Sequence, residues 1–421
     1  MKAIEAIEIG RTWLGGKIFF LLGDPIQLSA LKTSISTAAQ FFVRKYKLPE
    51  IRDEDSLRET ISFLNENENA GKNFLKNVYR YGHRSVCESY NHAFLLLGVS
   101  RYATFKFWLP ARPSCDVIAE GVEMSLRRVE ARDYVKPSKF VEESAEESFD
   151  TYHRLLERGI PKQDARYALA FSTKTMVMWH APLGREVGKI ANFLKDDPVK
   201  EVREIGETLK NFNDNLFGIN FIERPNGGEL PIRRNEEEIN FENFNPRKKV
   251  QNIYYDPTLQ TVKALVKESI TSTHQHIRNR KTHFIHASLE RSLYQLDFVY
   301  PPTCRGETQE ILKEHYTEIK EKLLDAYLER RMEDLLYSMP LGKEILHKIY
   351  IWNNEDISYT IALRTCLKAQ HEIRGIYNQI MNEIKDKFPG KLGPNCVIQG
   401  KCEEFGKEKC QLYQKLILKS D

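Results

Sequence analysis

The sequence predicts an α+β fold made of two tandem copies of one domain, each a sheet packed with helices, with pseudo-twofold symmetry between the copies. Three observations predict it. The chain has 421 residues, which is long for one hydrophobic core and suits two domains. Residues 222–248 are rich in Pro, Gly, Asn and charge, as linkers often are. The segments on either side repeat short blocks in the same order, which indicates duplication of a whole domain.

The repeated blocks set the predicted boundaries. SLRR in the first half corresponds to SLER in the second, YHRLLERGIP to DAYLERRMED, and the triplet EVR at 201–203 to EIR at 372–374. We therefore predict a first domain at 1–221, a linker at 222–248, and a second, shorter domain at 249–421 that ends in a cysteine-containing tail.

Helical patterns dominate the first domain. Residues 109–116 contain two prolines, which predict a loop, and residues 117–135 have a helical composition. Residues 142–220 are predicted to be helices. The first of them closes at Gly159, because glycine readily adopts the left-handed conformation that ends many helices.

The second domain begins with a long helical pattern at 257–296. The segment LDFVYPP, residues 296–302, predicts a strand that its prolines end. Residues 307–337 carry a charge-laced helical pattern. Residues 356–390 carry another, which a Pro-Gly pair ends.

The composition is that of a soluble globular protein, with 41% hydrophobic and 29% charged residues. The 63 basic and 59 acidic residues leave a net charge of +4, which does not favour nucleic acid as the main partner but allows anionic small ligands. No apolar run reaches the ~18 residues of a membrane span, and KIFFLLG does not read as a signal peptide. Seven cysteines fit a reducing compartment, so a cytoplasmic location without membrane association is predicted.

Four blocks carry a resemblance to a known family. They are YGHRSVCESYNHAFLLLGVSR at 81–101, ERGIPKQDARYAL at 157–169, THQHIRNR at 273–280 and NNEDISYTIALRTCLKAQHEIR at 353–374. In the same order they resemble the G-H-x-S-x-x-E…G-V-S-R, A-R-x-x-L, T-H-Q-x-x-R-H-R and N-x-R…A-Q-x-E-I-R motifs of the flavin-dependent thymidylate synthases, the ThyX family. The chain is identified as a diverged, two-copy member, so both predicted domains are expected to be ThyX-like.

The resemblance implies a flavin-dependent methyltransferase that converts dUMP to dTMP. FAD is the expected cofactor, NADPH the reductant, and methylene-tetrahydrofolate or a pterin analogue the one-carbon donor. Such chemistry needs no protein nucleophile, so the protein supplies binding, orientation and electrostatics. Arginines suit that task, because the guanidinium presents a fixed fork of donors to phosphate. G-x-G-x-x-G after a strand and the P-loop motif do not occur, so neither usual nucleotide site is supported.

The matching positions define the candidate ligands of the flavin and of the nucleotide. The resemblance implies flavin contacts from Arg278, Asn279, Arg280, His83, Ser85, Glu88 and Arg185. It implies nucleotide contacts from Gln275, Ser288, Ser125, Arg127, Arg166 and Arg374.

The two halves depart from the family motifs at different places. The first half has Leu109–Ala111 where the family has R-H-R, and the second has Glu290 where the family has the arginine of S-x-R. Leu335-Leu336 and Glu355 replace two further second-half motif positions. This pattern predicts active sites shared between the two halves, and a homodimer of tandem chains in place of the family's tetramer.

Other interpretations remain open. Arg278 and Arg280 also fit a solvated helical stripe, His83 fits a structural histidine, and Arg166 and Arg374 fit surface ion pairs. Random decay would also damage both halves. The alternative function is a non-catalytic paralogue that binds a nucleotide or nucleic acid, and Asn279 and Glu290 are its best support among the motif positions.

The tail raises the question of a metal. Cys396, Cys402 and Cys410 follow a C-x5-C-x7-C spacing, and Cys304 supplies a fourth thiol. Four thiolates suffice for zinc or an iron–sulfur cluster, but most zinc sites contain a closer C-x2–4-C pair. These cysteines are therefore weak metal candidates beside reduced thiols or a local disulfide.

Overall fold

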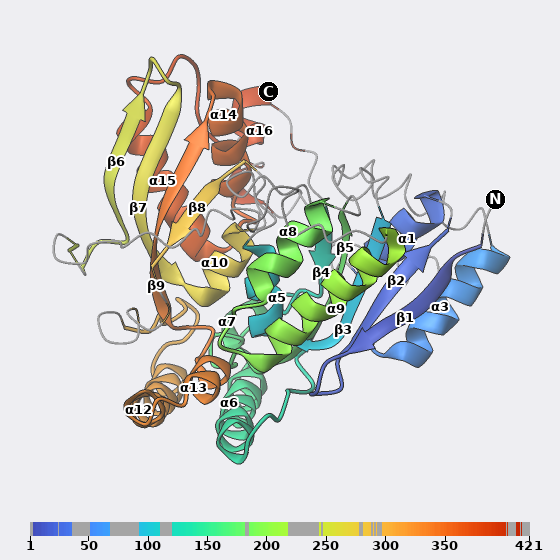
Figure 1. Ribbon diagram of the computed structural model, residues 1–421. Coiled ribbons are helices and arrows are strands. Elements are labelled where there is room, and N and C mark those ends of the chain that lie inside the picture. The colour runs from blue at the N-terminus through green and yellow to red at the C-terminus, as the bar shows by residue number, and fades with distance from the viewer. Residues whose placement is uncertain are drawn as a thin grey trace, which may run out of the picture. The chain divides into compact units, whose positions relative to one another are not determined.

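The computed structural model describes residues 3–23, 25–35, 51–67, 92–109, 120–181, 185–217, 244–245, 247–277, 281–287, 289, 292, 297–400, 402, 410–412 and 414. The chain divides into two compact units. The first contains Met1–Arg233 and Tyr300–Leu341, and the second contains Arg234–Val299 and Gly342–Asp421. Both units combine helices with an antiparallel sheet, so the α+β class is confirmed (Figure 1).

A five-stranded antiparallel sheet forms the centre of the first unit, in the order β1-β2-β3-β5-β4. On one face an apolar cluster joins Phe19, Leu95 and Met178 to helices α1 and α3. The opposite face carries stacked Phe94 and Trp179 rings. The strands are β1 (Glu5–Arg11), β2 (Lys17–Leu22), β3 (His92–Ser100), β4 (Glu120–Glu123) and β5 (Lys174–Ala181), and the helices α1 (Pro25–Ile35), α3 (Glu54–Glu66), α5 (Arg101–Trp108), α8 (Arg185–Leu194) and α9 (Lys200–Phe217).

A separate layer of helices completes the first unit: α6 (Lys139–Glu157), α7 (Lys162–Ala165), α12 (Glu307–Leu328) and α13 (Met332–Ser338). The Ser138 side chain caps α6 by accepting from the Val141 amide, and Gly159 follows the helix at φ +79°, as predicted. Helix α12 also lies where the charge-laced pattern predicts it.

Helices α12 and α13 come from beyond the predicted linker, yet they belong to the first unit. His315 donates to the Ala168 carbonyl at 3.0 Å, and burial lowers the pKa of this imidazole to about 4, so it is neutral. An isolated β-bridge pairs Ala170 with Pro340. The compact units therefore differ from the contiguous division at 222–248, most of which lies outside the described residues.

The second unit is built on a four-stranded antiparallel sheet in the order β6-β7-β9-β8. Helix α15 packs on β6 and β7, and α14 packs on β7 and β9. The elements are β6 (Val250–Asp256), β7 (Thr261–Ser269), α10 (Ile270–His276), β8 (His283–His286), β9 (Glu344–Trp352), α14 (Asn354–Arg364), α15 (His371–Ile384) and α16 (Asn395–Gln399).

The two sheets repeat one topology. The order β6-β7-β9-β8 in the second sheet matches the order β2-β3-β5-β4 in the first. The two central strands are antiparallel in both sheets, β3 with β5 and β7 with β9. In both sheets the second of these four strands runs directly into a short helix, α5 or α10. The chain order that follows is also the same in both halves. Strand β4 is followed by α6, α7, β5, α8 and α9, and strand β8 is followed by α12, α13, β9, α14 and α15.

Three sequence predictions of helices were wrong. Residues 117–135 contain strand β4 followed by turns, the range 142–220 is interrupted by β5, and 257–296 contains β7, α10 and β8. The central strands are buried on both faces, so they lack the alternation that distinguishes a strand from a buried helix. The 356–390 pattern is two helices, and the LDFVYPP strand is reduced to a bridge between Phe298 and Lys343.

Among the described residues, no helix combines the length and the apolar character needed to cross a membrane.

Candidate functional site

In both units a serine and a distant glutamate join the central strand to the helix that follows it. Ser100 caps α5 by accepting from the Ala103 amide at 2.9 Å, and its own amide donates to Glu201 at 3.2 Å. Ser269 caps α10 in the same way, and its amide and hydroxyl both donate to Glu372 at 2.8 Å. The repeated EVR and EIR triplets thus place one carboxylate at the same structural position in each unit.

The environments of these two carboxylates differ. Burial raises the pKa of Glu201 to about 7, against the opposing hydrogen bonds from Ser100 and from the Tyr337 hydroxyl at 3.0 Å. Burial also raises the pKa of Glu372, but Lys249, whose Nζ lies 3.6 Å from its Oε1, opposes that rise. Hydroxyl and amide donors serve the first carboxylate, and an ammonium group helps the second.

Three arginines of the first unit lie close enough together to influence one another. Arg166 follows α7 and is 5% exposed, and its Nε donates to the Gln163 carbonyl at 2.9 Å. Burial, together with the positive charges of Arg127 and Arg101, lowers the pKa of Arg166 to about 9. A bound anion would offset this repulsion, so the group has the electrostatics of an anion site.

Arg101 pairs with a buried carboxylate of the first unit. Arg101 contacts the carboxylate of Glu123 at 2.9 Å, and Glu123 is 1% exposed. The same carboxylate accepts from the Thr104 hydroxyl at 2.8 Å and from the Trp108 indole at 3.2 Å. Arg101 therefore has a structural role, and Arg127 and Arg166 are the better candidates for a ligand.

The predicted S-x-R segment supplies one of these arginines, Arg127. Ser125 and Arg127 follow strand β4, and the Arg127 amide donates to the Ser125 hydroxyl at 3.4 Å. Both side chains are partly exposed, unlike Arg166. Three predicted nucleotide ligands, Ser125, Arg127 and Arg166, thus belong to one compact unit.

Two other predicted nucleotide ligands lie in the second unit. Gln275 is on α10, and its carbonyl accepts from Arg364 at 3.5 Å. Arg374 is on α15, partly exposed, and donates to the Leu367 carbonyl at 2.8 Å.

Most predicted flavin ligands fall outside the described part of the chain. Arg185 is the first residue of α8, and its side chain is not described. The predicted residues outside the described ranges are His83, Ser85, Glu88, Arg278, Asn279, Arg280 and Ser288, together with the departure at Glu290.

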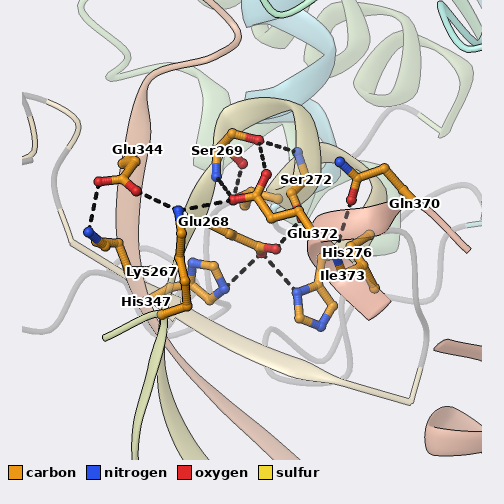
Figure 2. Close-up of polar contacts among 12 residues, drawn as sticks. Lys267, Glu268, Ser269, Ser272, His276, Glu344, His347, Gln370, Glu372 and Ile373 are labelled. Atoms are coloured by element: carbon orange, nitrogen blue, oxygen red, sulfur yellow. Dashed lines mark hydrogen bonds and ion pairs between the residues drawn. The ribbon is translucent and has the colours of Figure 1, made fainter. Parts of the chain in front are cut away.

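A buried polar cluster in the second unit was not predicted. Glu268 on β7, His276 on α10 and His347 on β9 converge, and Figure 2 shows both imidazoles pointing toward the Glu268 carboxylate. Burial favours a high pKa for Glu268, but the imidazoles hold the pKa well below its usual range. Burial lowers the pKa of His276, which favours the neutral form of this ring beside the carboxylate. His276 lies within THQHIRNR, but Glu268 and His347 lie on other elements, so the spacing of the motif did not indicate the cluster.

The predicted cysteine set is split between the units. Cys304 lies in the first unit, where burial raises its pKa to about 11 and favours the neutral thiol. Cys396, Cys402 and Cys410 lie in the second unit. Burial raises the pKa of Cys396, and Cys402, Cys366 and Cys410 raise it further, so Cys366 is a neighbour of the tail thiols that the spacing did not reveal.

Comparisons with known proteins agree on one family. The profile of Thy1, the thymidylate synthase complementing proteins, matches residues 28–212 and 260–390. The two matched segments include strands and helices from both compact units.

Two curated relatives bear the name flavin-dependent thymidylate synthase. The protein from Sulfurisphaera tokodaii is 31% identical over 140 residues, which are 31% of this chain and 53% of that protein. The protein from Saccharolobus solfataricus is 28% identical over 140 residues, 31% of this chain and 52% of that protein. The chain thus spans about half the length of the curated relatives it matches.

A solved structure with local likeness is that of a UMP/dUMP methylase PolB from Streptomyces cacaoi bound with 5-Br UMP. It is 16% identical, and the match covers 30% of this chain and 70% of that chain. The TM-score is 0.25, too low to support an argument from structural likeness.

Proposed function

Since the chain belongs to the Thy1 family of thymidylate synthase complementing proteins, we propose that it methylates a pyrimidine nucleotide, converting dUMP to dTMP. The names of the two relatives and the retained S-x-R and A-R segments support this proposal. Because the match spans only part of each relative, the activity is inferred for the whole protein from partial similarity.

The arginine group of the first unit is the observation that carries the proposal. Arg166 is 5% exposed, and the positive charges of Arg127 and Arg101 lower its pKa, so a bound anion at this position would be stabilised. Arg127 and Ser125, which are partly exposed, are further hydrogen-bond donors in the first unit. A nucleotide phosphate matches this set, because arginine forks donate to two phosphate oxygens at once.

FAD is the proposed cofactor, with NADPH as reductant and methylene-tetrahydrofolate or a pterin analogue as one-carbon donor. In the family a reduced flavin supplies hydride. The side chains predicted to contact flavin lie outside the described part of the structure, so family membership is what supports the flavin.

A tandem duplication is the proposed origin of the two halves. The repeated strand order and the paired Ser100–Glu201 and Ser269–Glu372 contacts support it. The pseudo-twofold relation, the sharing of active sites between halves and the homodimer of tandem chains stay predictions. Light scattering would test the dimer: a stable monomer would count against it.

Nucleotide binding by matched arginine variants tests the proposal. Losing a charge-assisted hydrogen bond costs roughly 1.5–3 kcal/mol, which corresponds to roughly tenfold to a hundredfold in affinity. We therefore expect Arg127→Ala and Arg166→Ala each to weaken dUMP binding by at least ~10-fold in calorimetric titrations. Arg154→Ala, which removes an exposed arginine of α6, should bind like the wild type.

The two arginine variants protect the test against a folding defect. Arg166 is buried and its removal can perturb α7, whereas Arg127 is partly exposed and its removal should leave the thermal transition unchanged. Wild-type affinity for dUMP in both variants would overturn the nucleotide assignment. A parallel titration with FAD separates the functions, because failure to bind FAD would favour the non-catalytic paralogue.

A further inference from the structure

Three side chains with metal-binding atoms converge in the core of the second unit. Glu268 Oε1 lies 2.8 Å from His276 Nδ1 and 3.0 Å from His347 Nε2. All three side chains have 0% exposure. They come from different elements, β7, α10 and β9, so only the folded unit brings them together.

Two hydroxyl groups, those of Ser272 and Tyr377, contact the outer atoms of this cluster. The Ser272 hydroxyl donates to Glu268 Oε2, which leaves Oε1 to face the imidazoles. His276 Nε2 lies 2.5 Å from the Tyr377 hydroxyl, so its Nδ1 alone faces the carboxylate. Histidines that ligate metals characteristically use one ring nitrogen for the ion and the other for such a hydrogen bond.

His347 is the group that hydrogen bonding leaves unexplained. Its Nε2 lies 3.0 Å from Glu268 Oε1, but its buried Nδ1 has no hydrogen-bond partner among the described residues. A buried polar group without such a bond is costly. A cation between the three side chains would use the Nε2 lone pair and explain why it faces a carboxylate.

The first unit shows that this topology does not require a polar cluster. Counting from the equivalent residues Ser100 and Ser269, and from their strand partners Lys174 and Glu344, the corresponding positions are Val99, Phe107 and Val177. All three have 0% exposure. Apolar side chains therefore fill the same positions in the first unit, and the carboxylate and imidazoles of the second need another explanation.

We propose that Glu268, His276 and His347 bind a divalent transition-metal ion, with Zn²⁺ the first candidate, in the core of the second unit. Two imidazoles and one carboxylate are a common zinc set and leave one position for a non-protein ligand. Fe²⁺ accepts the same ligands, so elemental analysis must distinguish the ions. The ion would tie β7, α10 and β9 together in the core, because all three side chains are buried. This inference is independent of the proposed methylase activity.

Metal analysis of the full chain tests the proposal. We expect ~1 ion per chain after refolding with excess Zn²⁺ and removal of free metal. His347→Gln and Glu268→Gln should each lower that content at least ~10-fold, because removing one ligand of three weakens the site severely. The control is Cys396→Ser/Cys402→Ser/Cys410→Ser, which removes the three tail thiols of this unit and should retain the ion.

A second measurement needs no variant and so does not depend on how the variants fold. The wild-type chain refolded with Co²⁺ should show visible ligand-field bands without the near-ultraviolet thiolate-to-cobalt charge-transfer band. Metal-free wild-type protein, undiminished metal in both ligand variants, or loss of the ion in the cysteine variant would overturn the proposal. A strong thiolate band would assign the metal to the tail cysteines instead.

Discussion

The two sheets share a strand order but bury different chemistry beneath their central strands. Val99, Phe107 and Val177 occupy the positions in the first unit that Glu268 and two histidines occupy in the second. Apolar packing and a polar cluster are thus both compatible with one topology. The comparison teaches that strand order and core chemistry are separable. The fold alone therefore does not require the polar cluster of the second unit.

The capping carboxylates show the same contrast on a smaller scale. Glu201 and Glu372 each accept from the amide of the serine that starts the helix. Glu201 has hydroxyl and amide donors, and burial raises its pKa to about 7. Glu372 lies 3.6 Å from the ammonium of Lys249. One geometric requirement is therefore met by hydroxyl and amide donors in one unit and with an added ammonium contact in the other.

The largest effect should come from placing the second unit's carboxylate in the first. Val99→Glu would bury a carboxylate where no imidazole faces it, and we expect the free energy of unfolding to fall by about 4 kcal/mol or more. Thermal unfolding followed by circular dichroism measures this loss. Val99→Leu, which stays apolar, should cost about 1 kcal/mol.

A triple variant sharpens that comparison. Val99→Glu/Phe107→His/Val177→His recreates the three side chains of the second unit in the first, and with Zn²⁺ present it should regain part of the lost stability. If the triple variant is no more stable than Val99→Glu, with or without Zn²⁺, then the three side chains do not converge in the first unit as they do in the second, although their backbone positions are equivalent.

An intermediate effect is expected from Glu201 as a function of pH. The folded protein keeps this proton up to about pH 7, whereas the unfolded chain releases it near the ordinary value of 4.5. The wild-type free energy of unfolding should therefore fall as pH rises from 4.5 to about 7, by about 3 kcal/mol. Glu201→Gln has no proton to release and should lack this fall.

Denaturant titrations across this range measure the difference. Above pH 7 the Glu201→Gln variant should be the more stable protein, and below pH 4.5 the two should agree. Glu207→Gln, an exposed carboxylate on the same helix, should follow the wild type. A parallel fall in Glu201→Gln would contradict the assignment of a raised pKa to this residue.

The smallest effect is expected at Lys249. Lys249→Met removes the ammonium that lies 2.5 Å from Glu344 and 3.6 Å from Glu372. Its side chain is 36% exposed, and Lys267 still contacts Glu344 at 3.0 Å, so we expect a loss of only about 1 kcal/mol. The exposed neighbour Lys248→Met is the control, and equal melting temperatures in both variants would show that Glu372 does not need this cation.

The sequence identified features that depend on neighbouring residues. Gly159 directly follows the helical pattern that it closes, so local sequence predicted where α6 ends. Central strands such as β5 and β7 were missed where 142–220 and 257–296 were assigned as helices, because full burial removes the alternation of polar and apolar residues. The Ser125–Arg127 and Ala165-Arg166 segments were found by motif, and the structure adds that their guanidinium groups influence each other.

By itself the sequence determined the family, the α+β class and the arginines expected to face an anion, because motifs and helical periodicity are written in short stretches of chain. Only the tertiary structure decided that residues 300–341 pack in the first unit and that Glu268, His276 and His347 meet. The reason is physical: such contacts join positions far apart in the chain, and burial and strand pairing, which no local pattern encodes, determine which distant side chains share a core.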